Sequence, residues 1–460
     1  MMNGMDSTSD GTGLKGYDAR SSSEDAARMD PNMEYGDLKS DVPGESSSDD
    51  ALAKALAGVD DFHLRRAVER LREGLFDPLA VRLLTAHEKN LNEAVDRGFR
   101  EVDEAKSPHL CIVGAYGQGK SHSLTYIQDR ALREGFAVSM INLDPREIPF
   151  HDLRQVYRAL MANLRLPGAD DASFIARWKA WADARTTPKA DAAGFPADLL
   201  PAGMPHFFKC VLAAIAQKSI SLPDKQKKSK KHAGFRPREF PYLLARALNG
   251  EPVPLPRIRD VFKYRQVSFY KESSLACRGT EPFLQMVRGL ASLFRLMGHR
   301  GWVLLFDEAE SIGQVRIFAR SRSYKLLDRM FWPKTPVQGL FPVFAFTDDF
   351  FERVKQEDYD QARIRGEIEI PYFERNYAQA WRDLNTYRPH DLSRQEWKEL
   401  SDKLIRLHAR AYRWSPPEPR MRQEMAARLE ELRNQETRLK LKALVDQLDL
   451  IQQEQMFCGL

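Results

Sequence analysis

Residues 114–121 carry a pattern that could bind a chain of phosphates. They match G-x-x-x-x-G-K-S at every defined position, and glycines there let backbone N–H groups and the next helix approach phosphate oxygens. The Lys120 ammonium would reach the β- and γ-phosphates, and the Ser121 hydroxyl would hold Mg²⁺. The pattern predicts a site for a nucleoside triphosphate with magnesium, which we expect to be ATP. The expected contacts are Gly114, Ala115, Tyr116, Gly117, Gln118, Gly119, Lys120, Ser121 and His122.

A pair of acids could complete such a site. The apolar segment 302–306 ends in Asp307 and Glu308. We expect Asp307 to bind magnesium and Glu308 to polarise the attacking water, because in-line phosphoryl transfer needs an oriented nucleophile beside a charge-neutralising metal. The alternative is a helix N-cap followed by a first-turn acid, which is stabilising but catalytically silent. A phosphate loop in the same chain favours hydrolysis, with Lys120 and Glu308 as catalytic residues.

Other polar residues could sense or stabilise the transferred phosphate. Thr347 follows the apolar segment 341–346, where an AAA+ ATPase carries the polar residue that senses the γ-phosphate, and Asp348 could serve instead. The alternative for both is an ordinary turn. An arginine often stabilises transition-state charge, although a surface salt bridge is the alternative for any one of them. The candidates are Arg363, Arg365 and Arg438.

The elements around these residues predict an α/β protein with a parallel sheet. The phosphate loop lies between an expected strand at 109–114 and an expected helix at 121–134, and a second strand follows at 136–143. Almost two hundred residues separate the two motifs, so a helical insertion must lie within this core. The remaining expected elements are helical segments across 151–218, a helix at 281–299, and strands at 302–306, 341–346 and 368–373.

Composition divides the chain into four expected regions. An acidic tail spans residues 1–55, and we expect it to be disordered because it has few apolar residues. A helical segment spans 56–107, with two short helices separated at Asp77-Pro78. The phosphate-loop ATPase core spans 108–375, with its helical insertion at about 150–300. A helical lid or partner domain spans 376–460.

The charge distribution suggests a polyanionic partner. The net charge is +5, but residues 1–50 hold twelve Asp and Glu against four Lys and Arg, so the remainder is basic. Such a body attracts nucleic acid, and simple solubility is the alternative. The segment 221–240 is dense in lysine and is either a solvated linker or a contact to DNA phosphates. Its lysines are Lys225, Lys227, Lys228, Lys230 and Lys231.

Neither membrane insertion nor secretion is indicated by the sequence. It contains no run of about 18 consecutive apolar residues and no basic-then-apolar start, so we expect a cytoplasmic protein. Four cysteines lie far apart without metal-ligand spacing, which predicts free thiols. They are Cys111, Cys210, Cys277 and Cys458.

Several short stretches resemble the ATP-binding family of BREX phage-defence systems, the BrxD-like proteins. They are residues 114–122, 128–129, 142–145 and 156–158, within a similarity covering about 62–455. The resemblance implies an AAA+-like fold and genes beside a helicase or methyltransferase. It suggests an ATPase that drives a conformational or assembly step in a defence complex acting on DNA, and it leaves a homo-oligomer possible. The alternatives are a nucleotide-switched scaffold with little turnover and a replication-initiator-like DNA loader, which would need a winged-helix module.

Overall fold

The computed structural model describes most of the chain from residue 52 onward. The described residues are 52–53, 56–75, 77–85, 88–168, 172–186, 195–217, 237–364 and 372–458. The predicted acidic tail, apart from residues 52–53, lies outside them, as do the five lysines of the 221–240 segment and Arg365. Residues 52–53 are helical and Leu52 is buried, so this end of the expected disordered tail is ordered. Most of the expected strand at 368–373 also lies outside, and its last two residues, Tyr372 and Phe373, lie in a bend.

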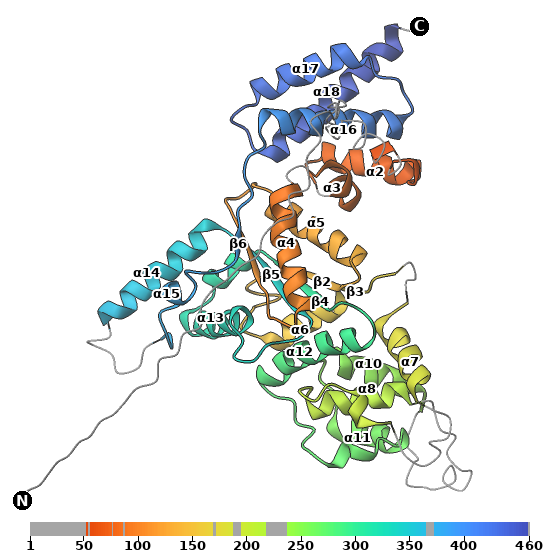
Figure 1. The fold of residues 1–460 in the computed structure, drawn as a ribbon, viewed down its shortest axis with the longest axis vertical. Coiled ribbons are helices and arrows are strands. Elements are labelled where there is room, and N and C mark those ends of the chain that lie inside the picture. The colour runs from red at the N-terminus through yellow and green to blue at the C-terminus, as the bar shows by residue number, and fades with distance from the viewer. Residues whose placement is uncertain are drawn as a thin grey trace, which may run out of the picture. The chain divides into compact units, whose positions relative to one another are not determined.

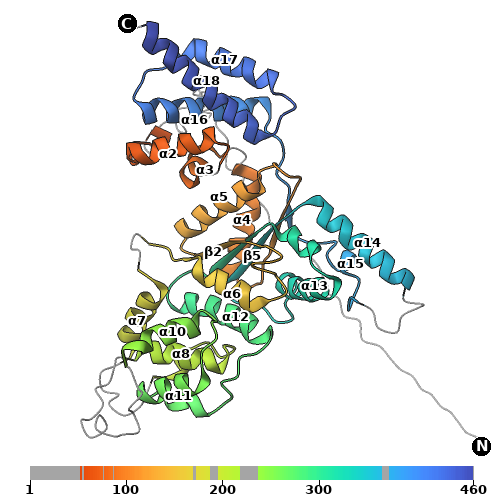
Figure 2. The same cartoon turned by 180° about the vertical axis from the view of Figure 1, so that it is seen from behind.

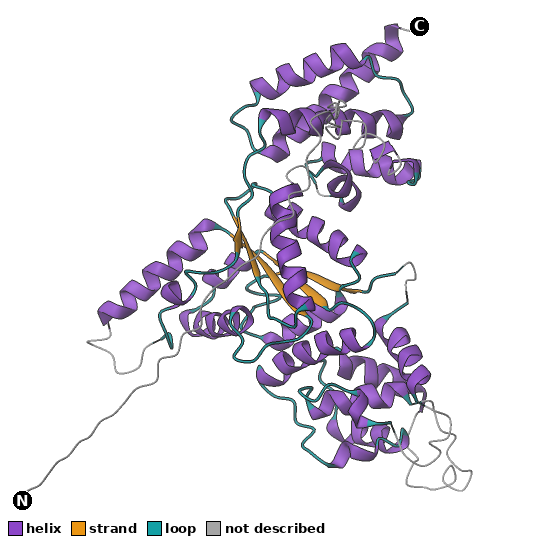
Figure 3. Cartoon of the chain, in the orientation of Figure 1, coloured by secondary structure: helices purple, strands orange, loops and turns teal. Residues whose placement is uncertain are grey.

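Six strands form one sheet in the order β3-β2-β4-β5-β1-β6. Figure 3 shows the strands in orange, with helices around them. All neighbouring pairs are parallel except β2 with β3, so the predicted α/β class with a parallel sheet is confirmed. Four strands lie within one residue of their expected bounds, whereas the two-residue strands β3 and β6 are too short for a sequence pattern. The strands are β1 (Leu110–Val113), β2 (Ala137–Asn142), β3 (Leu164–Arg165), β4 (Trp302–Asp307), β5 (Leu340–Phe346) and β6 (Thr386–Tyr387).

Helices cover both faces of this sheet, as a parallel sheet requires. Successive strand residues point to opposite faces, so Ile112 packs in one hydrophobic cluster and Cys111 in the other. Helices α4 (Glu88–Asp103) and α5 (Lys120–Arg133) supply the first cluster (Figure 1). The second cluster contains α6 (Leu153–Ala162), α12 (Glu281–Leu296) and α13 (Ile317–Phe331). Strands β1, β4 and β5 are buried throughout because apolar side chains meet them on each side.

The expected helical insertion lies between β2 and β4 (Figure 2). Its central helix is α8 (His206–Ala216), in which nearly every side chain is buried. Trp178 of α7 donates from Nε1 to the Leu212 carbonyl oxygen of α8 at 2.9 Å, which satisfies a buried indole N–H. The other helices of this part are α7 (Phe174–Arg185), α10 (Phe240–Leu248) and α11 (Leu255–Tyr264).

Helices from the two ends of the described chain share one hydrophobic core. Helix α2 (Asp61–Arg72) follows the predicted helical spacing, and the Asp77 carboxylate caps α3 (Pro78–Leu84) by accepting from the Leu79 N–H at 2.9 Å. Their apolar faces pack with the three C-terminal helices. These are α16 (Arg394–Tyr412), α17 (Glu418–Glu431) and α18 (Thr437–Cys458).

A paired side-chain contact fixes this helical core. The Arg72 guanidinium donates from Nε and Nη2 to the two carboxylate oxygens of Asp449, each at 2.8 Å. Such a bidentate pair is more specific and stronger than a single ion contact.

Two further helices, α14 (Asp348–Ile364) and α15 (Tyr377–Ala380), follow β5.

Two predictions about chemistry of the chain can be compared with the fold. Cys111, Cys210 and Cys277 are free, in agreement with the expected unpaired thiols, and the Cys458 side chain lies outside the description. Burial raises the pKa of the Cys111 thiol, which makes it a poor nucleophile.

Within the described part of the chain, no helix is both long enough and apolar enough to span a bilayer.

Candidate functional site

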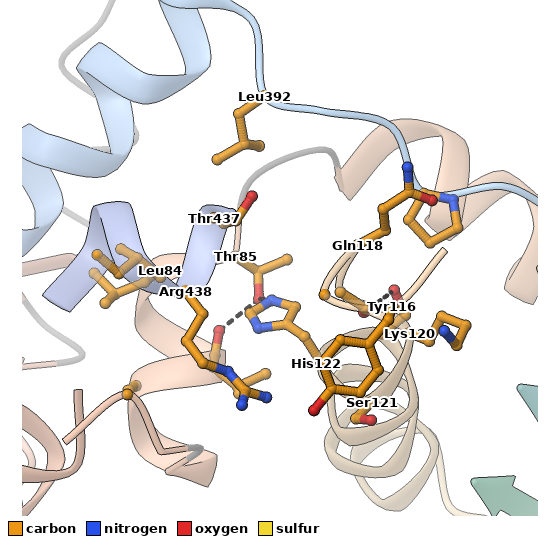
Figure 4. A pocket seen from close by; sticks show the side chains of 18 of the residues that line it. Leu84, Thr85, Tyr116, Gln118, Lys120, Ser121, His122, Leu392, Thr437 and Arg438 are labelled. Carbon is orange, nitrogen blue, oxygen red and sulfur yellow. Dashed lines mark hydrogen bonds between the residues drawn. The ribbon is translucent and has the colours of Figure 1, made fainter. Parts of the chain in front are cut away.

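A cavity of about 230 Å³ is lined by both the predicted phosphate loop and the predicted acids. Figure 4 shows the loop side of it, with Lys120 and Ser121. Residues 116–123 line one part of it, and Asp307 and Glu308 line another. The loop follows β1 and the acids end β4, two parallel strands on either side of β5, whose carboxyl ends lie at one edge of the sheet. The two sequence motifs, almost two hundred residues apart, therefore form one site.

The loop has the backbone that phosphate binding needs. Gly117 and Gly119 have φ values of 82° and 88°, in the left-handed region that side chains other than glycine rarely adopt. Gly119 is also the N-cap of α5, so no side chain competes for the helix's first N–H groups. These donors and the positive end of the helix dipole are available to an anion.

Lys120 is held over the loop that precedes it. Its side chain is 9% exposed, and its Nζ donates to the carbonyl oxygens of Gly114 and Ala115, both at 3.0 Å. Gln118 braces the same turn, because its Oε1 accepts from the Ala115 N–H at 2.7 Å. The ammonium thus occupies the inside of the loop, where a phosphate could replace the two carbonyl oxygens as its partner.

The two predicted acids differ in exposure. Asp307 is buried at the end of β4, and its Oδ1 accepts from the Glu308 N–H at 2.9 Å. Glu308 is exposed and has a φ of 56°, a strained conformation for a residue with a side chain. This backbone turns the chain sharply into η5 (Ala309–Gln314), a short 3-10 helix. Such strain often marks a functional position.

Glu310 is a cavity residue that the sequence analysis missed. Its Oε2 is buried and has no hydrogen-bond partner among the described residues. Burial raises the pKa of the Glu310 carboxyl, Lys120 opposes this shift, and the charges of Glu308 and Asp307 add to it. The sequence did contain a signal for it: residues 307–310 read Asp-Glu-Ala-Glu, so a third acid follows the predicted pair after one residue.

Thr347 and Asp348 lie beside the loop but do not line the cavity. Strand β5 runs next to β1, and Gly114 donates its N–H to the Phe346 carbonyl oxygen at 3.2 Å. Thr347, the following residue, is half-buried at this position. Asp348 begins α14 and forms an ion pair with Arg388.

Arg438 is the candidate arginine that reaches the cavity. It lies in the first turn of α18 and lines the cavity together with Thr437. Arg363 lies near the end of α14, but its side chain is outside the description, as is the whole of Arg365. A chain position more than 300 residues from the phosphate loop thus contributes a cation to its surroundings.

The part of the cavity away from the acids is apolar. His122 lies beside it, and its Nε2 is 3.0 Å from Thr85 Oγ1 (Figure 4). Burial lowers the pKa of His122 to about 4, so its imidazole is neutral at physiological pH. The apolar lining residues come from α2, α3, α4 and the C-terminal region: Leu71, Ala80, Val81, Leu84, Leu91, Leu392, Leu400 and Leu441.

The donors around the loop suit a hard cation. Hydroxyl and carboxylate oxygens are the ligands that Mg²⁺ prefers, and Ser121 and Asp307 both line the cavity. No set of three or more His, Cys, Asp or Glu side chains that could hold a metal occurs in the described ranges.

Fold and site together define a mixed α/β protein with a mostly parallel sheet and a glycine-rich loop joining its first strand to a helix. The family model of BREX system ATP-binding proteins BrxC/D matches residues 63–190 and 279–458, and the chain belongs to this family. This confirms the resemblance inferred from the sequence. No curated protein and no solved structure gives a significant match. The unmatched stretch 191–278 contains α8, α10 and α11.

Proposed function

We propose that this chain is an AAA+-like P-loop ATPase, which binds ATP with Mg²⁺ and hydrolyses it to ADP and phosphate. One observation carries the proposal: the loop at residues 114–121 and the acids Asp307 and Glu308 line the same cavity. Membership of a family of BREX system ATP-binding proteins supports ATP as the nucleotide. The position of β5 between β1 and β4, with Thr347 at its end, supports the AAA+-like arrangement.

Each part of the cavity has a role in this proposal. The N–H groups of the loop and the Lys120 ammonium bind the phosphates, and Ser121 and Asp307 hold Mg²⁺. When bound, the metal neutralises charge that develops on the phosphate oxygens. Glu308 is exposed to the cavity and orients the attacking water as a carboxylate. Thr347 senses the γ-phosphate from the neighbouring strand.

The apolar part of the cavity accepts the adenine ring. Ligand pockets commonly combine apolar walls with a few polar groups that fix orientation. Here Leu84 and Leu441 supply apolar wall from opposite ends of the chain, and Arg438 brings a cation from α18. Because these groups belong to the shared helical core, nucleotide binding would couple that core to the sheet. Hydrolysis would then release the coupling.

Family membership supports a role for this coupling in BREX phage defence. We propose that the ATP cycle drives a conformational or assembly step in a defence complex that acts on DNA, with other BREX proteins as partners. The helical core at the two chain ends is the part best placed to transmit the nucleotide state, since it contributes directly to the cavity. Contact with DNA and formation of a homo-oligomer are further parts of this proposal.

The test is nucleotide binding and steady-state turnover of the full chain, alone and with single- or double-stranded DNA. Lys120→Ala should weaken ATP binding at least about tenfold, because a charged hydrogen-bonding group contributes about 1.5–3 kcal/mol. Glu308→Gln should bind ATP with Mg²⁺ normally but hydrolyse it about a hundredfold more slowly. Tight binding with no measurable turnover in the wild type would instead identify a nucleotide-switched scaffold. Unchanged ATP affinity in Lys120→Ala would refute the site itself.

A further inference from the structure

A second cavity, of about 490 Å³, lies where α6 and α12 begin and α13 passes. It shares no lining residue with the first cavity. Its polar lining includes His151, Arg154, Arg278, Thr280 and Arg322, together with one acid, Asp152. Residues from three separate segments of the chain therefore converge on one space, which neither motif of the sequence analysis predicted.

Among the described residues, the arginines of this second cavity have no acidic partner. Over the residues that the structure describes, no acid forms an ion pair with Arg154, Arg278 or Arg322. Arg154 is held in place, because its Nε donates to the Gly250 carbonyl oxygen at 2.7 Å and its guanidinium lies over the Phe283 ring. Its terminal nitrogens remain for another acceptor.

The one acid of the cavity is occupied by its own helix. Asp152 is the N-cap of α6, and its Oδ1 accepts from the N–H groups of Arg154 and Gln155. Its Oδ2 accepts from the Gln155 side chain at 2.9 Å. Three guanidinium charges and one carboxylate leave a net charge near +2, which a divalent anion would balance.

Two further polar groups point to a ligand. The Nδ1 atom of His151 is buried and has no hydrogen-bond partner among the described residues, which is uncommon for a buried polar atom. Thr280, the N-cap of α12, makes no side-chain cap hydrogen bond, so the first-turn N–H groups of Glu281 and Phe283 donate none to it, and Pro282 between them has no N–H. An acceptor bound in the cavity would give both the His151 imidazole and the first turn of α12 a hydrogen-bond partner.

We propose that this cavity binds a phosphate group, at a site distinct from the proposed nucleotide site. The planar guanidinium fork matches phosphate oxygens in pairs, and three such forks around one cavity favour a tetrahedral dianion. His151 and Thr280 supply single hydrogen bonds to the same group. The phosphate comes either from a free anion or from a nucleic-acid backbone, and the two sources are separated by experiment.

The test uses the full chain carrying Lys120→Ala, so that the first cavity contributes little. Binding of inorganic phosphate is measured by calorimetry, and binding of a fluorescent 30-nucleotide DNA by anisotropy. The test variant adds Arg278→Gln and Arg322→Gln, both at exposed positions where folding should tolerate the change. The matched control adds Arg257→Gln, an exposed arginine of α11 outside the cavity.

We expect the double substitution to weaken phosphate binding at least about tenfold, and the control to leave it unchanged, because two charged donors are lost. If DNA binding weakens in parallel and DNA competes with phosphate, the backbone of a nucleic acid is the source. If phosphate binding alone weakens, the ligand is a free anion. Equal phosphate affinity in test and control variants would overturn the proposal.

Discussion

The carboxylate of Glu436 faces Gly117 across the phosphate loop. A methyl group added at Gly117 would lie only 2.9 Å from Oε2 of Glu436. Glu436 immediately precedes α18, so the C-terminal helices place a negative charge beside the loop that we propose binds phosphates. An anion arriving at the loop must either displace this carboxylate or bind against its repulsion.

Glu436→Gln should therefore strengthen ATP binding. Two like charges about 4 Å apart repel by about 1 kcal/mol in water and by more in a partly buried site, so we expect a gain of roughly fivefold or more. The gain should shrink at high salt. Titration with a fluorescent ATP analogue measures it. Glu431→Gln, an exposed change on α17, is the control. Weaker binding in Glu436→Gln would mean that Glu436 assists the nucleotide.

Glu310→Gln should stabilise the protein without nucleotide near neutral pH. Burial raises the pKa of Glu310 above that of the unfolded chain, so its ionisation in the fold is unfavourable. Its contribution to stability is present below the unfolded pKa and is lost as pH rises through the folded pKa. The variant should thus melt higher than wild type at pH 7.5 and similarly at pH 4. A lower melting temperature at pH 7.5 would show that the charge is needed, for example opposite Lys120.

The free energy of unfolding should fall as the pH is lowered from 6.5 to 4, because the buried His122 imidazole resists protonation in the fold. Burial lowers the pKa of His122 from 6.5 to about 4, so this stability is present above pH 6.5. As pH falls, the unfolded chain binds the proton first, and the free energy of unfolding drops by about 3 kcal/mol over this range. His122→Asn should show a shallower decline in urea titrations. His63→Asn, at an exposed position of α2, controls for replacing a histidine. Equal slopes in wild type and His122→Asn would exclude the effect.

Leu448 should be essential to the shared helical core, whereas its near neighbour Leu450 should not. Leu448 is completely buried and Leu450 is 54% exposed on the same helix. Leu448→Ala should cost about 2–5 kcal/mol of unfolding free energy, while Leu450→Ala should change it by less than about 0.5 kcal/mol. Denaturant unfolding followed by circular dichroism gives both values. Similar losses in the two variants would contradict the packing described for α18.

The position of the glycine-rich loop between a strand and a helix, and the four longer strands, could be predicted because their signals are local. Residues 114–121 form a contiguous motif, and β1, β2, β4 and β5 are short apolar runs bounded by turn residues. Strand β6 could not be predicted, because its two residues pair with β1 only through the tertiary fold. The expected strand at 368–373 lies mostly outside the description, and the described neighbour of β1 on that side is β6.

Other features depend on contacts between distant residues. The Asp77-Pro78 helix start was readable locally, but the packing of α2 against α16 and α18 was not. Arg72 and Asp449 lie 377 residues apart, and nothing in either segment indicates its partner. Glu310 was missed for a similar reason, because its burial depends on η5 and the distant loop lining one cavity.

The shared core of α2, α3 and the C-terminal helices has a consequence for synthesis of the chain. Leu64 and Val68 of α2 are fully buried, in part against helices that begin only at residue 394. At 5–20 residues per second, a ribosome needs about 15–60 s to translate from the end of α3 to the start of α16. During that time the apolar face of α2 has α3 beside it but lacks its C-terminal partners. A chain terminated before α16 would expose that face permanently and would be a target for chaperones and proteases.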